Sequence, residues 1–190
     1  MKRKEFLDLY QTVMVTDPKT GKQKRRAKYI GPYYETDMAS KRKLVPLLWV
    51  LFVLQAAVYA VPGLMFSTMM TAWYVLVPYL ICLLPMLYAL MAMFEISTIK
   101  NPLTRVKLAE GPESAKNMTT ASAVVGIIWL VCDIIFAFAG AFGATLASNI
   151  ICMVCAAAFS GLNAMMAVKI RTMVITEKPQ ETEERHEGEA

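Results

Sequence analysis

Asp133 is the residue of this sequence best placed to do chemistry inside a membrane, because it is the one acidic or basic side chain within four long apolar stretches. Those stretches contain no Lys, Arg or His, so the chain supplies no ion-pair partner at that depth. A carboxylate there costs at least about 2.5 kcal/mol on insertion scales. We therefore expect Asp133 to be protonated for much of the time, since burial disfavours its charged form.

The depth of Asp133 suggests which groups accompany it. Counting inward from the expected ends of the stretches places it slightly outside the midplane, level with Tyr59, Tyr79, Asn149 and Cys152. Two tyrosine hydroxyls and one amide are its predicted partners, and Asp133, Tyr59, Tyr79 and Asn149 form the candidate intramembrane polar site. One hypothesis is a proton or cation site. We favour a neutral aspartate that joins helices through hydrogen bonds, since transport sites usually recruit several polar groups.

Small residues recur along the same helical face as Asp133. Gly126, Asp133 and Gly140 are spaced by seven, and the last stretch has a matching polar or small stripe at Asn149, Cys152, Ala156, Ser160, Asn163 and Ala167. Small residues let helix backbones approach closely in lipid. We therefore predict tight packing of the third and fourth stretches along a seam that includes Gly126, Gly140, Cys152 and Ala156.

Cysteine chemistry is the main catalytic possibility that the sequence raises. Cys152-Met-Val-Cys155 resembles, over these four residues, the C-x-x-C of membrane quinone-linked thiol oxidoreductases, which have four-helix cores. Those enzymes pass electrons through an exterior cysteine pair, and all four cysteines here lie inside apolar stretches. Two thiols and the distant His186 do not complete a tetrahedral zinc site. With no nucleophile elbow, P-loop or H-E-x-x-H motif either, we expect free thiols, no metal, no cofactor and no enzyme.

The apolar stretches themselves define the fold class. They cover residues 44–66, 72–94, 119–142 and 144–168. At 1.5 Å per residue, each is long enough to cross a hydrocarbon core roughly 30 Å thick. The prediction is an all-α integral membrane protein, a four-transmembrane-helix bundle of two hairpins within residues 44–168.

The basic residues give an orientation. Of the 20 Lys and Arg, twelve precede residue 44, four lie in the loop 95–118 and four in the tail 169–190, whereas the two hairpin tips have none. Basic residues near span ends stay inside, so we expect a multi-pass protein of the cell membrane with both termini cytoplasmic. The net charge of +5 sits mainly beside the first span. Anionic lipid headgroups are therefore the expected partner of this N-terminal arm, and nucleic acid is not.

Three segments outside the membrane have predicted structure. In the arm, residues 1–43, a short helix over about residues 1–10 precedes a β-hairpin whose turn is Asp17-Pro-Lys-Thr-Gly21. The central loop is expected to be broken at Asn101-Pro102 and Gly111-Pro112, with one or two helical turns between them. The acidic tail, residues 169–190, is expected to be disordered from Glu177 onward.

Two function classes follow from these features. The favoured one is a non-catalytic module or accessory subunit that assembles through its transmembrane helices, as a homo-oligomer or in a larger membrane complex. The alternative is a small proton- or cation-coupled transporter or channel that uses Asp133. In helix count the chain is similar to the small multidrug-resistance exporters, but those place their acidic residue in the first helix, where this chain has Gln55.

Overall fold

The computed structural model describes residues 9–16, 23–65, 68–139 and 146–178. Within these ranges four helices are long and apolar enough to span a membrane, which confirms the predicted fold class. They are α2 (Met38–Leu64), α3 (Trp73–Thr98), α5 (Ser114–Phe138) and α6 (Leu146–Arg171). At 25 to 27 residues each, they are roughly 40 Å long. The protein is therefore a multi-pass membrane protein.

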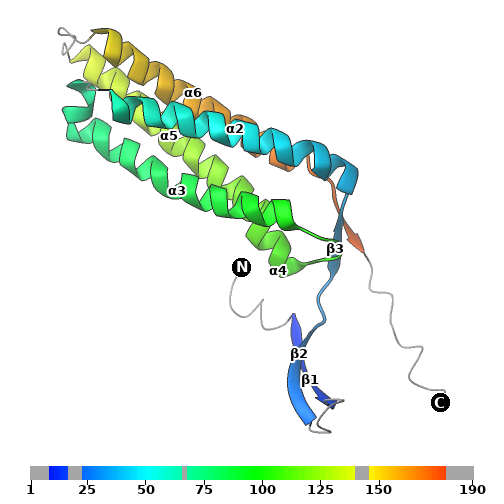
Figure 1. Ribbon diagram of the computed structural model, residues 1–190. Helices are drawn as coiled ribbons and strands as arrows, with labels where there is room; N and C mark the ends of the chain where they lie inside the picture. The colour runs from blue at the N-terminus through cyan, green and yellow to red at the C-terminus, as the bar shows by residue number, and fades with distance from the viewer. Residues whose placement is uncertain (1–8, 17–22, 66–67, 140–145, 179–190) are drawn as a thin grey trace.

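The four helices run side by side as an elongated bundle, with the strands gathered at one end (Figure 1). We call this end the sheet end and the opposite end the loop end. Helix α5 packs against both α3 and α6, and α2 packs mainly on α6. The sequential helices α2 and α3 make much less contact, although η1 (Thr68–Thr71) connects them at the loop end.

Large apolar side chains cover the outside of the bundle. Val50, Leu84, Met91 and Val154 are each at least 60% exposed, while the polar side chains of Gln55 and Asp133 are fully buried. This distribution inverts that of a water-soluble protein, in which so large an apolar surface would mark a binding site. An apolar outer surface of this kind is suited to contact with lipid.

The N-terminal arm contains the predicted β-hairpin. Strands β1 (Tyr10–Thr16) and β2 (Gln23–Tyr29) pair antiparallel, with Tyr10 opposite Tyr29. The predicted turn at residues 17–21 and most of the predicted helix, residues 1–8, lie outside the described residues. Tyr10, which the sequence placed at the end of that helix, begins the strand.

A three-stranded sheet, absent from the sequence-based prediction, closes the sheet end of the bundle. Its central strand is β3 (Tyr33–Thr36), which pairs antiparallel with β4 (Leu103–Thr104) on one side and β5 (Ile175–Lys178) on the other. The arm, the central loop and the tail thus meet in one sheet. Because hydrogen-bonded strands cannot lie on opposite faces of a bilayer, these three segments share one side of the membrane.

Strand β5 corrects the predicted tail. Disorder was expected from Glu177, but Glu177 pairs with Tyr34. The acidic composition that suggested disorder begins inside a segment that also contains Ile175 and Thr176, whose β-branched side chains suit a strand. Residues 179–190 lie outside the described residues.

The central loop is more helical than predicted. After β4, α4 (Arg105–Leu108) leads through the π-helical segment η2 (Ala109–Glu113) directly into α5. Pro112 was expected to break the chain, since it lacks a backbone N–H and its ring clashes with the preceding turn. The wider π turn accommodates it instead, and the helical path continues into the bundle.

Candidate functional site

The bundle interior contains an aromatic cluster near the loop end. Tyr59 of α2 and Tyr79 of α3 stack with ring centroids 4.5 Å apart and planes inclined by 10°. Each hydroxyl donates to the backbone carbonyl of the other residue at 3.1 Å. Trp129 of α5 lies edge-on to Tyr79, and Phe159 of α6 contacts Trp129, so all four spans contribute a ring. This cluster joins α2 to α3 where their backbones are not closely packed.

The two tyrosines are consequently not the predicted hydrogen-bond partners of Asp133. Their hydroxyls donate to each other's backbone carbonyls instead. A sequence cannot reveal this because the choice depends on which helices are neighbours. Asn149, the third predicted partner, is fully buried near the start of α6.

Asp133 is fully buried on α5, five residues before the helix ends at Phe138. The indole N–H of Trp129, one helical turn earlier, lies within interaction range of the carboxyl. Neither group forms a hydrogen bond of good geometry with any described residue. Trp129 was missed as a partner, although its spacing of four from Asp133 places the two on the same helical face.

Other polar side chains are buried between the spans. Gln55 of α2 and Ser122 of α5 have no hydrogen-bond partner among the described residues. Ser160 and Asn163 of α6 donate to the carbonyls one turn earlier, at 2.9 Å each. Buried polar groups of this kind can join helices in lipid. The burial of Gln55 could have been predicted from the sequence, since Gln55 is the only amide side chain in the first span.

The interface between α5 and α6 contains the predicted seam residues that the structure describes. A Cβ built on Gly126 would lie 2.5 Å from Ser160 Oγ and 2.9 Å from the Phe159 ring. Cys152 and Ala156 are fully buried on α6. The remaining members of the α6 stripe, Asn149, Ser160, Asn163 and Ala167, are buried as well. Gly140 lies outside the described residues.

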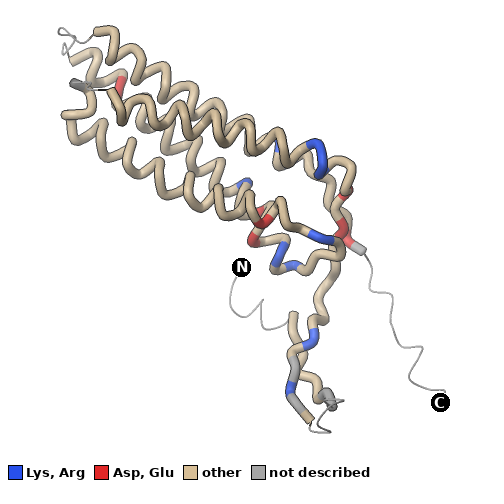
Figure 2. Tube along the Cα trace, in the orientation of Figure 1, with Lys and Arg blue, Asp and Glu red and all other residues tan. Residues whose placement is uncertain are grey.

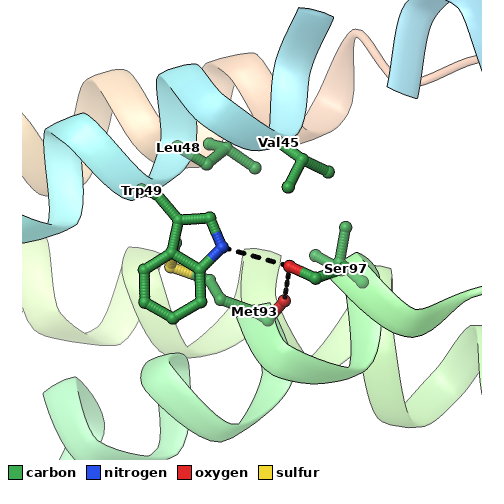
Figure 3. A pocket seen from close by; sticks show the side chains of 6 residues that line it. Val45, Leu48, Trp49, Met93 and Ser97 are labelled. Atoms are coloured by element: carbon green, nitrogen blue, oxygen red, sulfur yellow. Dashed lines mark hydrogen bonds between the residues drawn. The ribbon is translucent and has the colours of Figure 1, made fainter. Parts of the chain in front are cut away.

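A narrow cavity, too small for a water molecule, lies between α2 and α3 near the sheet end. Val45, Leu48 and Trp49 line it from α2, and Met93, Ile96 and Ser97 from α3 (Figure 3). Its polar edge is a relay in which Trp49 Nε1 donates to Ser97 Oγ at 3.1 Å and Ser97 Oγ donates to the Met93 carbonyl at 2.8 Å. The polar atoms of this wall are thus satisfied, and it offers no reactive group.

Specific polar contacts join the helices to the sheet. Lys41 Nζ of α2 donates to the carbonyls of Ser97 and Ile99 at the end of α3, at 3.1 and 2.7 Å. The Asn101 side chain bonds both to the N–H and to the carbonyl of Thr36, at 3.1 and 2.9 Å. These contacts make the sheet end a fixed cap on the bundle.

Tyr29 attaches the β-hairpin to this cap. Its hydroxyl donates to the Pro32 carbonyl at 2.9 Å and accepts from the backbone N–H of Arg105 at 2.8 Å. Partial burial raises the pKa of this phenol above its ordinary value. Its neutral form, which donates and accepts as the contacts require, is therefore retained at physiological pH.

The chemistry available to this set of groups is limited. Among the described residues no group of three His, Cys, Asp or Glu side chains could hold a metal ion. Cys152 and Cys155 are both buried on α6, and neither forms a disulfide with a described residue. Comparisons with protein-family models, with curated proteins and with solved structures find no match.

Proposed function

We propose that this protein is a non-catalytic membrane module that assembles with a second copy or with other membrane chains through its transmembrane helices. The observation that carries the proposal is the outward face of α6. Ala157, Gly161 and Ala164 are exposed there, and a Cβ built on Gly161 would meet no atom within 4 Å. The Ala157-to-Gly161 spacing gives a small-x-x-x-small pattern, which permits close helix contact in lipid.

Flanking residues continue this face along the helix. Ile150, Val154 and Val168 are exposed at heptad-compatible spacing on either side of the small residues. Gly126, by contrast, already lies against Ser160 and Phe159 within the chain. The inner small-residue seam is thus occupied by the hairpin itself, and the outward α6 face remains available for a partner helix.

The interior supports assembly better than transport. The cavity between α2 and α3 is lined by residues other than Asp133. Aromatic rings from all four spans contact one another in the bundle interior. The buried polar side chains are distributed over α2, α5 and α6. Hydrogen bonding between helices is the role that this arrangement favours for Asp133.

For orientation, we propose a cell-membrane protein with the sheet end in the cytoplasm. Lys and Arg gather at that end of the bundle, as Figure 2 shows. The arm, the central loop and the tail share this side through one sheet, and basic residues near span ends are retained inside.

The test of assembly is the mass of the purified protein and of any co-purifying chain in mild detergent. Wild type is expected as an oligomer or complex, and Gly161→Leu as a monomer with unchanged helicity, because the bundle leaves room at this position. Ala60→Leu is the matched control, since Ala60 is also a small exposed residue but lies on α2. A wild-type monomer without co-purifying chains contradicts the proposal, and so does Gly161→Leu that assembles normally.

A further inference from the structure

A second cavity lies between α2 and the end of α6, at the sheet end. It has a volume of about 190 Å³ and is lined by Ser40, Lys43, Leu44 and Leu47 of α2, by Lys169 at the end of α6, and by Thr172 just beyond. Lys43 and Lys169 are 126 positions apart in the chain, so only the fold brings them to one site. The volume admits several water molecules, and hence a tetrahedral phosphate group.

The two lysines are the groups left to bind a ligand there. Within the described residues neither has an ion pair. The Thr172 hydroxyl already donates to the Lys169 carbonyl at 2.7 Å. Lys43 interacts electrostatically with Asp37, which lies outside the cavity lining. The Asp37 carboxylate already accepts from the backbone N–H groups of Ala39 and Ser40, at 3.0 and 3.2 Å. The cavity lining thus contains two ammonium groups and no carboxylate.

Lys43 has a different environment from Lys41, because its side chain is exposed at the cavity. Two residues earlier on the same helix, Lys41 is buried and donates to two carbonyls at the end of α3. Lys43 instead faces α6, where Leu44 and Leu47 begin the apolar surface of α2. The cavity therefore places positively charged side chains directly beside apolar ones. A phospholipid has the matching arrangement, because its charged headgroup is joined directly to apolar acyl chains.

We propose that this cavity binds the phosphate of an anionic phospholipid, with Lys43 and Lys169 on the phosphodiester and Leu44 and Leu47 against the first acyl carbons. The bound lipid would join the first span to the last. This site requires only the membrane-spanning fold, so it stands or falls independently of assembly through α6.

The experiment measures lipid retained by the purified protein, using native mass spectrometry with added phosphatidylglycerol or phosphatidylcholine. Wild type is expected to prefer phosphatidylglycerol, and Lys43→Gln with Lys169→Gln to bind it more weakly, by on the order of tenfold. Lys100→Gln with Lys107→Gln removes the same charge from exposed positions of the central loop and should leave binding unchanged. Lys43→Arg with Lys169→Arg should preserve it.

The remaining outcomes identify the ligand or reject the site. Glycerol 3-phosphate has the same phosphate without acyl chains, so equal binding of this soluble probe would assign the cavity to a free phosphate ester and overturn the lipid proposal. Equal affinity for phosphatidylcholine, or unchanged phosphatidylglycerol binding in the glutamine pair, would also overturn it. Folding of each variant is checked by helicity, and the arginine pair tests the charges even if the glutamine pair misfolds.

Discussion

The hydroxyl of Tyr59 donates to the Tyr79 carbonyl while the hydroxyl of Tyr79 donates to the Tyr59 carbonyl, both at 3.1 Å. The stacked rings fill the gap between α2 and α3 and bind each helix through its backbone. In lipid, a carbonyl or hydroxyl without a protein partner cannot form a hydrogen bond to water instead. Each of these two bonds therefore satisfies a tyrosine hydroxyl that would otherwise be buried without a partner. This reciprocal pair is a specific connection between two spans that otherwise pack mainly on other helices.

Removing either hydroxyl should therefore weaken the bundle without displacing the rings. Tyr59→Phe and Tyr79→Phe are each expected to cost about 0.5–1.5 kcal/mol. Unfolding in detergent measures the loss. Tyr88→Phe is the control, because Tyr88 also lies on α3 but is 59% exposed. Equal stability of Tyr59→Phe and wild type would show that these bonds are replaced by others.

The two glycines of the α5 and α6 pair should respond oppositely to an added methyl group. Gly126→Ala would place a Cβ 2.9 Å from the Phe159 ring, whereas the corresponding Cβ on Gly161 meets nothing within 4 Å. Overpacking of this kind costs about 1–3 kcal/mol. Thermal unfolding should thus occur at lower temperature for Gly126→Ala and at an unchanged or higher temperature for Gly161→Ala. If Gly161→Ala unfolded at a lower temperature than Gly126→Ala, the close contact between α5 and α6 would not lie at Gly126.

The pairing of the tail with the arm predicts a specific crosslink. Tyr34 and Glu177 are direct partners in the antiparallel pair of β3 and β5. Tyr34→Cys with Glu177→Cys should form a disulfide on mild oxidation, since paired strand positions bring Cβ atoms within about 4.5–5.5 Å. Tyr34→Cys with Thr176→Cys should not, because adjacent strand positions face opposite sides of the sheet. Gel mobility with and without reductant distinguishes them.

Local pattern and long-range pairing explain what could be predicted from the sequence. The spans were predictable because lipid leaves few structures for a long apolar stretch, and the burial of Cys152 and Ala156 follows from helical spacing. Strand β5 was missed because its partner Tyr34 is more than 140 positions away. The contact between Tyr59 and Tyr79 depends in the same way on which helices become neighbours. So does the presence of Lys43 and Lys169 in the lining of one cavity. Trp129 is different, since its spacing from Asp133 was visible in the sequence.

Helix α2 should lose its N-terminal cap in acid. The Asp37 carboxylate accepts from the backbone N–H groups of Ala39 and Ser40, which hold its pKa below the ordinary value of 3.8. Because the pKa is lower in the folded protein than in the unfolded chain, this stabilisation is fully present above the unfolded value and is lost as the pH falls through the folded value.

The measurement compares wild type with Asp37→Asn, whose amide can cap the helix but does not titrate. The difference between their melting temperatures should shrink between pH 6 and pH values below about 3. Asp37→Ala should be less stable than both at neutral pH. A difference between wild type and Asp37→Asn that stays constant over this range would mean that the carboxylate charge does not contribute.

Substitution of Asp133 distinguishes most clearly between a membrane module that assembles and a transporter or channel. Asp133 is fully buried, it lies beside the indole of Trp129, and the two cavities described above are both lined by other residues. If it acts as a neutral hydrogen-bonding group between helices, Asp133→Asn should preserve folding and assembly, because the amide keeps the size and the donor and acceptor capacity of a protonated carboxyl. Asp133→Leu should lower stability, since leucine can neither donate nor accept a hydrogen bond between helices.

Reconstituted vesicles then test transport directly. Wild type is expected to show no proton or cation flux above that of protein-free liposomes, and Asp133→Asn should be indistinguishable from it. Trp129→Phe serves as the matched control, because it removes the neighbouring N–H but leaves the carboxyl in place. A clear flux in wild type that Asp133→Asn abolishes, with folding intact, would reverse the assignment. The carboxyl would then have to exchange protons or cations with water, which an aspartate serving only to join helices does not require.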